Sequence, residues 1–283
     1  MSVCIKVWDE YDLDLSLYPS FTYPFYIRTG RRRYVKVYGV LHGMTIYQSG
    51  EEVCCDNCGT SLLRALTGAW FNPHILVSRI EKSVFREIIL DLLEKYPGLG
   101  IAIDPWDPVG VFYSVYLSQN TRFHTIVCRW MKKLFKVADN DYKLVSVSPR
   151  IAGTSYQLEL LDRTRDLLPQ IIHAVMKLPV YDARKRLLYV KNVGPKIAHA
   201  YLMFSRGSTY LPPVDRHLKR FVKEVLNINL EMPCRPLCIR YSCPECPLRE
   251  KCIVSVLQRE IGVMAGWLQT ATYVLGQQMS KGT

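Results

Sequence analysis

The segment VKNVGPKIA, residues 190–198, contains the turn that decides the fold. Its centre consists of four residues, Lys191, Asn192, Val193 and Gly194. Glycine adopts a positive φ without steric cost, and asparagine tolerates one better than most residues. Pro195 suits the first position of a following helix. The segment therefore predicts two short helices joined by a tight hairpin, although a pattern of this length also fits an ordinary helix connection.

The start of the helix after the hairpin suits the binding of an anion. Backbone N–H groups there lack partners inside the helix, and the helix dipole places partial positive charge beside them. A DNA phosphate is one anion that such a site binds. The chain is also basic, because 37 Lys and Arg residues stand against 25 Asp and Glu residues and give a net charge of +12. Since that charge attracts polyanions, we expect nucleic acid or an anionic surface as the partner.

Two residues after the hairpin have side chains that suit covalent chemistry. Lys196 falls in the first turn of the second helix, where the helix dipole and any burial both favour the neutral amine that attacks carbon. Asp215 lies nineteen residues later and is expected to cap the next helix. A capping carboxylate is fixed and ionised, so it also suits stabilising positive charge on a sugar. Taken singly, a solvated lysine and a plain helix cap explain both residues.

Five cysteines follow in a short segment: Cys234, Cys238, Cys243, Cys246 and Cys252. Four thiolates from one loop suit an iron–sulfur cluster or a zinc ion. Cys243, Cys246 and Cys252 are expected as three of the ligands. The fourth is Cys238 or Cys234, and we favour Cys238 because the shorter loop closes at a lower cost in entropy.

The other cysteines are expected to be structural. For the CCDNC run that contains Cys54, Cys55 and Cys58 we favour a turn with buried thiols over a metal or redox site, and we place Cys4 and Cys128 in the core. The first residues lack the pattern of a signal peptide, and the cysteine content does not suggest a secreted disulfide scaffold. No run of about 18 apolar residues predicts a membrane span. We expect a protein of the cytoplasm (nucleoid) or nucleus that is not secreted.

The chain divides into a strand-rich part and a helical part. Alternating residues at 34–38 and 44–47 predict strands, after a turn at Arg31, Arg32 and Arg33 that suits solvation and phosphate contact equally. A four-residue repeat over 80–96 predicts a helix. Further helices are expected near 108–120, 122–136, 155–177, 182–190, 195–205, 215–226 and 253–279. We expect an α+β fold with a β-rich domain over 1–103, a helical domain over 104–233, a metal-cluster loop over 234–252 and a C-terminal helix over 253–283 that packs on the helical domain.

Two motifs resemble the helix–hairpin–helix DNA glycosylase superfamily. The NVGPK run at 192–196 with VDRH at 214–217 is similar to its hairpin, the lysine of its bifunctional members and its following aspartate. The resemblance implies catalytic roles for Lys196 and Asp215, and DNA contacts by the hairpin residues and His217. The CPECPLREKC run at 243–252 resembles the loop of endonuclease III and the adenine-mismatch glycosylases, which holds a [4Fe–4S] cluster. The gap before its first cysteine differs from the family's, which leaves the first ligand open.

Two other stretches resemble the 8-oxoguanine DNA glycosylases. The AGWLQTATY run at 265–273 is similar to their C-terminal helix, which implies that Gln269 and Tyr273 contact the damaged base. The segment 13–21 resembles strands of their β-rich first domain. It departs from them at Tyr18 and Pro19, where the family has the residues that contact the oxidised base.

The LSQNT run at 117–121 resembles the superfamily's helix-end motif. The resemblance implies that Gln119 fills the gap left by a flipped base, with Asn120 as a further substrate contact. A plain polar helix end explains the run equally well.

The resemblance implies a small β-rich domain followed by a mostly α-helical helix–hairpin–helix glycosylase domain with a [4Fe–4S] cluster loop. It implies a monomeric, bifunctional DNA glycosylase and abasic-site lyase of base excision repair. The implied partner is double-stranded DNA that contains a damaged base, with 8-oxoguanine favoured. Oxidised pyrimidines and deaminated or mismatched bases are alternative substrates. A non-catalytic DNA-binding protein and a zinc protein unrelated to repair are alternatives of a different class.

Overall fold

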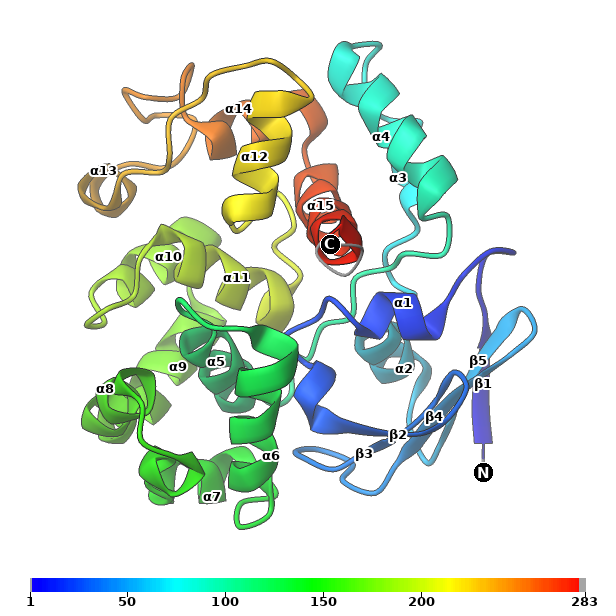
Figure 1. The fold of residues 1–283 in the computed structure, drawn as a ribbon, viewed down its shortest axis with the longest axis vertical. Helices are drawn as coiled ribbons and strands as arrows, with labels where there is room; N and C mark the ends of the chain where they lie inside the picture. Colours follow the sequence, from blue (N-terminus) through cyan, green and yellow to red (C-terminus); the bar gives the residue numbers. More distant parts are fainter. Residues whose placement is uncertain (1, 280–283) are drawn as a thin grey trace.

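The computed structural model describes residues 2–279 and places a five-stranded antiparallel sheet beside a larger group of helices (Figure 1). The strands are β1 (Ser2–Lys6), β2 (Tyr26–Gly30), β3 (Arg33–Lys36), β4 (Thr45–Ser49) and β5 (Glu52–Asp56). Their order across the sheet is β1-β5-β4-β3-β2, so β2 to β5 follow one another as hairpins and β1 adds to the far edge. The predicted α+β class is confirmed.

The segment after β1 is helical, which corrects the prediction of a strand there. Helix α1 (Leu13–Leu17) begins at Asp12, whose carboxylate accepts a hydrogen bond from the backbone N–H of Leu15. Leu13 and Leu17 lie four residues apart and are both fully buried, as expected for one face of a helix. Helix α2 (Thr60–Thr67) packs against α1 and against β1 and β5. The helical cap and spacing therefore override the alternating pattern of the sequence.

The turn between β2 and β3 contains the predicted arginine cluster. Arg32 takes a positive φ of 52° in this turn. Its guanidinium pairs with the carboxylate of Asp12 at 2.6 Å, which ties the turn to the start of α1. Arg31 and Arg33 remain exposed at the ends of the turn.

Two helices from the first hundred residues pack against the last two helices of the described chain. They are α3 (Pro73–Val77) and α4 (Val84–Lys95), and they contact α15 (Met264–Met279) and α14 (Ile253–Ile261) respectively. The indole of Trp267 in α15 is fully buried and donates to the carbonyl oxygen of Leu99 at 2.9 Å. The single helix predicted over 253–279 is interrupted at Gly262, whose φ is 54°.

The remaining helices form the larger part of the fold. They are α5 (Pro108–Leu117), α6 (Cys128–Phe135), α7 (Asp141–Ser146), α8 (Tyr156–Thr164), α9 (Leu168–Lys177), α10 (Val180–Leu188), α11 (Pro195–Arg206), α12 (Arg216–Glu224) and α13 (Arg235–Arg240). Helix α5 is buried over its whole surface and packs against α6 to α9 and α11. A short 3-10 turn at Arg165–Leu167 divides the helix predicted over 155–177. No helix among the described residues is long and apolar enough to cross a membrane.

A buried ionic group joins the sheet to the helices. The Lys36 ammonium on β3 donates to the carboxylates of Asp104 at 2.8 Å and Asp107 at 2.6 Å, and all three side chains are at most 3% exposed. Burial and the neighbouring Asp104 raise the pKa of Asp107 to about 8, although Lys36 opposes them. Asp107 lies just before α5, so the group fixes the start of that helix on the sheet.

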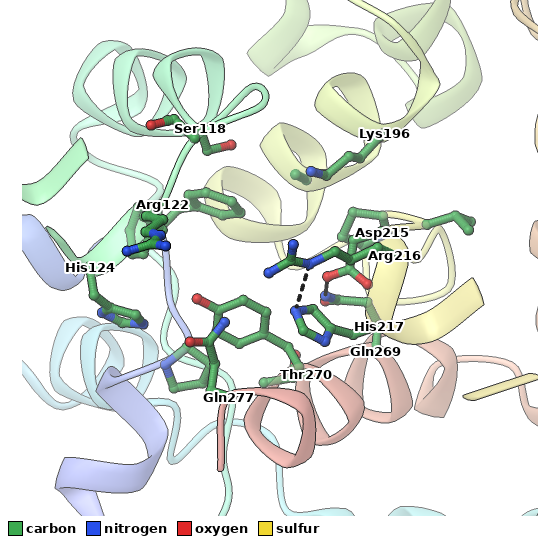
Figure 2. Close-up of a pocket in the computed structure, with 18 of the residues that line it drawn as sticks. Ser118, Arg122, His124, Lys196, Asp215, Arg216, His217, Gln269, Thr270 and Gln277 are labelled. Atoms are coloured by element: carbon green, nitrogen blue, oxygen red, sulfur yellow. Dashed lines mark hydrogen bonds between the residues drawn. The ribbon is translucent and has the colours of Figure 1, made fainter. Parts of the chain in front are cut away.

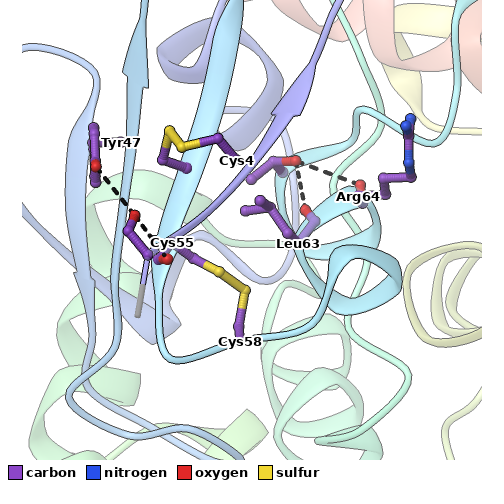
Figure 3. The surroundings of a disulfide bond; sticks show 9 residues. Cys4, Tyr47, Cys55, Cys58, Leu63 and Arg64 are labelled. Atoms are coloured by element: carbon purple, nitrogen blue, oxygen red, sulfur yellow. Dashed lines mark hydrogen bonds between the residues drawn. A yellow bond between two sulfur atoms is a disulfide. The ribbon is translucent and has the colours of Figure 1, made fainter.

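Four cysteines of the N-terminal part are paired as disulfides, Cys4 with Cys54 and Cys55 with Cys58 (Figure 3). Cys54, Cys55 and Cys58 are buried as predicted, but they are not free thiols. Cys4 is exposed on the edge strand β1, so its predicted place in the core is wrong, whereas Cys128 is buried and free. Cys4 and Cys54 face each other directly in the strand register, and this proximity accounts for their pairing.

Candidate functional site

A cleft of about 1060 Å³ opens among segments that are far apart in the sequence. Its walls come from Pro19 and Phe21, from the segment after α5, from α11, from the start of α12 and from α15 (Figure 2). Six of the predicted functional residues line this cleft together: Asn120, Lys196, Asp215, His217, Gln269 and Tyr273. The fold therefore brings the predicted catalytic and base-contacting residues to one place.

Lys196 lies in the first turn of α11 and is half-buried in the cleft wall. Burial is the main cause that lowers the pKa of its ammonium group. The Asp215 carboxylate opposes this shift, while the Arg216 guanidinium adds to it. Because the pKa is lowered, more of the amine is neutral near pH 7 than in a solvated lysine, and the neutral amine is the nucleophilic form.

Asp215 caps α12, as predicted, and both of its carboxylate oxygens have partners. Its Oδ1 accepts from the backbone N–H of Leu218 at 2.8 Å. Its Oδ2 accepts from the side-chain amide of Gln269 at 3.1 Å, which joins the start of α12 to α15 (Figure 2). These two bonds fix the carboxylate in the cleft that also contains Lys196. Gln269 thus holds the carboxylate and also lines the cleft.

His217 and Tyr273 form an aromatic wall of the cleft. Their rings meet edge to face, with centroids 5.6 Å apart. The Nε–H of Arg216 donates to His217 Nε2 at 3.3 Å, and burial is the main cause that lowers the pKa of His217. The imidazole lies so close to Gly276 of α15 that a Cβ atom there would overlap it. His217 was predicted to contact DNA, and the structure places it inside the cleft rather than at the hairpin.

The opposite wall contains residues that sequence analysis did not select. Arg122 and His124 come from the segment between α5 and α6, which includes a π-helical turn at Phe123–Val127, a geometry frequent at functional sites (Figure 2). The His124 ring stacks on Tyr18, with centroids 3.9 Å apart and planes 10° apart. No periodic pattern marks these residues in the sequence. Sequence analysis also did not select Arg216, which lines the cleft. Its position directly after Asp215 in the VDRH motif could have indicated it.

The two polar residues after α5 point in different directions. The amide of Gln119 donates back to the carbonyl oxygen of Tyr116 at 2.9 Å, and Gln119 does not line the cleft. Asn120 takes a positive φ of 50°, is exposed at the cleft, and donates to the hydroxyl of Tyr156 at 3.3 Å. Asn120 therefore faces the cleft, whereas the side chain of Gln119 bonds back to its own helix, and the predicted role of Gln119 beside a flipped base stays a prediction.

The hairpin between α10 and α11 lies where the sequence predicts it. The positive φ belongs to Asn192, at 63°, whereas Gly194 has an ordinary φ of −98°. Val193 is buried at 1% exposure, and Lys191 and Asn192 are exposed. Gly194 is the N-cap residue, and no side chain caps the first N–H groups of α11. Those groups remain available to an external anion.

A second cavity is lined by all five cysteines of the segment 234–252, together with Arg184 and His199. Burial raises the pKa of the Cys238 thiol to about 12, and the thiols of Cys243, Cys252 and Cys246 raise it further against the effect of Arg184. Cys238 is thus close to the three cysteines of the C-x2-C-x5-C motif. Among the described residues, no three of these five sulfur atoms lie within 4.8 Å of one another.

Arg184 brings a positive charge into this cavity. Its side chain is 1% exposed and donates to Cys243 Sγ at 3.1 Å and to the carbonyl oxygen of Cys238 at 3.0 Å. No carboxylate pairs with it among the described residues. Burial lowers the pKa of the neighbouring His199 to about 3, and Arg184 adds to that shift. A buried arginine needs a negative partner, and the cysteine sulfurs are the groups in reach.

The sequence matches no family of proteins and no curated protein. Solved structures match over nearly the whole chain. The 8-oxoguanine glycosylase/lyase of Clostridium acetobutylicum in its apo-form has a TM-score of 0.71 at 15% identity, covering 96% of this chain and 95% of that one. Its complex with double-stranded DNA that contains cytosine opposite 8-oxoG has the same TM-score and identity, with 99% and 96% covered.

A second kind of enzyme matches equally well. The 3-methyladenine DNA-glycosylase from Archaeoglobus fulgidus has a TM-score of 0.71 at 15% identity, covering 98% of this chain and 99% of that chain. The similarity thus extends over nearly the whole length of this chain for both kinds of enzyme. The chain has the fold of the helix–hairpin–helix DNA glycosylases.

Proposed function

We propose that the chain is a bifunctional DNA glycosylase with abasic-site lyase activity, acting in base excision repair. The observation that carries the proposal is one cleft that contains Lys196 with a lowered pKa, the fixed carboxylate of Asp215, and the Gln269 and Tyr273 side chains. The fold supports it, since two of the matched structures are described as an 8-oxoguanine glycosylase/lyase.

Double-stranded DNA that contains a damaged base is the proposed partner. The uncapped N–H groups of α11 and the exposed Lys191 would bind backbone phosphates. The damaged nucleotide would be flipped into the cleft, and Tyr273 would stack against its base. Asn120, which is exposed at the cleft, would fill the gap left in the duplex. We propose that the chain acts as a monomer in the compartment of the DNA, the nucleoid or nucleus.

The proposed reaction begins at the amine of Lys196. Its neutral Nζ attacks C1′ of the flipped nucleotide, and the bond from C1′ to the base breaks with the electron pair leaving on the base. Asp215 stabilises the positive charge that develops on the sugar. The attached nitrogen loses a proton, the leaving base gains one, and opening of the sugar ring gives a Schiff base. Removal of a proton from C2′ then expels the 3′ phosphate and cuts the strand.

The charges of the cleft favour a neutral base that carries carbonyl groups. The cleft is lined by four cationic residues and one carboxylate, Asp215; the cations are Arg122, Lys196, Arg216 and Lys219. A cationic base such as 3-methyladenine would meet repulsion from the arginines, whereas carbonyl oxygens accept hydrogen bonds from them. We therefore favour 8-oxoguanine. Oxidised pyrimidines and deaminated bases carry similar carbonyl groups and are the alternatives.

We also propose that Cys238, Cys243, Cys246 and Cys252 hold a [4Fe–4S] cluster. The cavity lined by all five cysteines supports a metal cluster held by thiolates. The buried charge of Arg184 supports it too, since an anionic cluster would provide the missing counter-charge. When bound, the cluster would hold the cysteine loop folded. Iron and sulfide content with visible absorbance would test this assignment, and a colourless protein that contains zinc and no iron would contradict it.

Borohydride trapping on DNA with 8-oxoguanine or an abasic site tests the reaction. The wild type should form a covalent complex, Lys196→Gln should not, and Lys177→Gln, which changes an exposed lysine of α9, should trap like the wild type. Equal trapping by wild type and Lys196→Gln would remove the lysine from the mechanism. A wild type that binds DNA tightly and releases no base from a panel of lesions would favour a non-catalytic binding protein instead.

A further inference from the structure

Three amide side chains line the cleft, and they belong to Asn120, Gln269 and Gln277. The first two already bind within the protein. The Asn120 amide donates to the hydroxyl of Tyr156, and the Gln269 amide donates to the carboxylate of Asp215. Among residues 2–279, the amide of Gln277 forms no hydrogen bond. Its Oε1 and the two N–H groups of its Nε2 are therefore available to a ligand.

Gln277 lies near the end of α15, and its side chain points into the cleft (Figure 2). The side chain is half-buried, and a nucleotide that entered the cleft would remove water from it. A polar group that loses water without gaining a partner costs free energy. A nucleotide whose base offers a matching donor and acceptor is therefore favoured over one that does not.

Gln269, Tyr273 and Gln277 are spaced four residues apart, so they lie on one face of α15. A helix rises about 1.5 Å per residue, so the eight residues from Gln269 to Gln277 span about 12 Å along its axis. Gln269 contacts Asp215, at the end of the cleft where the sugar would react. A nucleotide with its sugar at that end and its base against the Tyr273 ring would direct the far edge of the base toward Gln277.

We propose that Gln277 is a specificity-determining residue that binds this far edge of the flipped base. Its Oε1 accepts from a ring N–H, and its Nε2 donates to the neighbouring carbonyl oxygen of the base. Glutamine forms such paired hydrogen bonds with the edges of bases because its amide has a donor beside an acceptor. The proposal rests on the proposed function, because it requires a base in the cleft.

The charges of the cleft select this pairing over its alternative. An amide also pairs with an amino group beside a ring nitrogen, as it does with adenine. Four cationic side chains against one carboxylate favour carbonyl oxygens over amino groups nearby. We therefore expect bases that have an N–H next to a C=O, the edge that 8-oxoguanine shares with deaminated bases. Gln277 thus selects a chemical class of base.

Equilibrium binding to duplex DNA tests the contact, with Lys196→Gln as the parent because it should hold the lesion without releasing it. The readout is the ratio of the affinity for DNA with 8-oxoguanine to the affinity for DNA with a tetrahydrofuran abasic site, which has no base. Adding Gln277→Leu should lower this ratio about 10-fold, since leucine cannot form the paired bonds. The affinity for the abasic DNA should not change. An unchanged ratio, or an equal loss for both DNAs, would overturn the proposal.

Two further variants define the contact. Gln277→Glu loses the donor and places a negative charge against the carbonyl oxygen, so the ratio should fall at least as far as in Gln277→Leu. A glutamate that keeps the ratio of the parent would contradict pairing with a carbonyl. Gln278→Leu changes the next residue, which accepts from the Tyr96 hydroxyl and does not line the cleft, and it should keep the ratio. A loss there equal to that in Gln277→Leu would reveal a general effect on α15 and overturn the proposal.

The outcomes separate this inference from the proposed function. A wild type that releases no base would contradict the proposed function, whereas the binding ratio requires no reaction and still decides the role of Gln277. A ratio of one in the parent would overturn the inference, because the cleft would then hold no base.

Discussion

At the scale of single residues, the amine of Lys196 and the carboxylate of Asp215 have different surroundings in the cleft. Lys196 is half-buried, and burial disfavours its charged form. Asp215 receives two hydrogen bonds, one from a backbone N–H and one from Gln269. These two bonds hold the carboxylate in one position. The pair therefore combines an amine whose neutral form is favoured with a carboxylate fixed in the same cleft, an arrangement that suits the proposed attack on a sugar.

The rate of covalent trapping should rise with pH as Lys196 loses its proton. Since the pKa of Lys196 is lowered, the rise should level off below about 10.4, the usual lysine value. Single-turnover trapping between pH 5.5 and 10 would measure the midpoint. In Asp215→Asn the midpoint should move lower still, because the opposing carboxylate is gone. A wild-type rate that still climbs tenfold per unit at pH 10 would contradict the assignment.

Asp215→Asn should separate catalysis from stability. Asparagine caps helices about as well as aspartate, so the thermal midpoint should change little. Base release should slow on the order of 100-fold or more, because the variant removes a preorganised charge from the transition state. Single-turnover glycosylase assays and thermal melts would measure both. Asp12→Asn, at the cap of α1, is the matched control and should leave base release unchanged.

At the scale of elements, the sequence predicts those turns and helix ends that the backbone preferences of nearby residues determine. The hairpin was predictable because Asn192 and Gly194 tolerate a positive φ and Pro195 favours the first turn of a helix. The break between α14 and α15 was not, because the surrounding residues keep a helical pattern and only the positive φ of Gly262 ends the helix. The choice between Gln119 and Asn120 likewise depends on one left-handed residue, and the sequence permits that conformation at either position.

For the cleft, too, the sequence predicted only those residues that a local motif marks. Lys196, Asp215, Gln269 and Tyr273 were found through motifs of neighbouring residues. Arg122 and His124 were missed because their roles depend on a π-helical turn and on stacking against Tyr18, which is over one hundred positions away in the sequence. Contacts of that range follow from tertiary packing and leave no periodic signal.

The packing of α12 against α15 depends on the missing side chain of Gly276. In Gly276→Ala the new Cβ would overlap the His217 ring, so the ring or the helix must move. We expect the free energy of unfolding to fall by about 1–3 kcal/mol, as for an overpacked core site. We also expect weaker binding of DNA that contains 8-oxoguanine. Gly30→Ala, whose Cβ would meet only an ordinary contact with Arg33, is the control. Urea unfolding of both variants would compare them, and equal stability would contradict the close approach.

At the scale of the whole molecule, one buried ionic group joins the sheet to the helices. Lys36, Asp104 and Asp107 lie together at the start of α5. In the folded state the pKa of Asp107 is raised to about 8, from an ordinary value near 3.8. A raised carboxyl pKa means that the folded state prefers the protonated form. The contribution of protonated Asp107 to the free energy of unfolding is thus complete below about pH 4 and is lost as the pH rises through 8.

Asp107→Asn should therefore flatten the pH dependence of stability. The amide imitates the protonated carboxyl group, so the difference in free energy of unfolding between the variant and the wild type should shift in favour of the variant as the pH rises from 4 to 8. The buried His199 has the opposite sign, since its lowered pKa makes stability fall in acid, but it contributes equally to both proteins. Urea titrations at several pH values would give the difference. A difference that is constant across this range would contradict the raised pKa of Asp107.

The bond from Trp267 to the carbonyl oxygen of Leu99 joins residues 168 positions apart. Helix α15 is thus held in part by a segment that leaves the ribosome long before it, and the cleft is complete only when residues from Pro19 to Gln277 have all been made. A nascent chain that stops short of α15 would still present the hairpin with its exposed N–H groups, but it would lack Gln269 and Tyr273. Under the proposed function, such a chain would bind DNA and release no base, because the cleft proposed to perform the reaction would be incomplete.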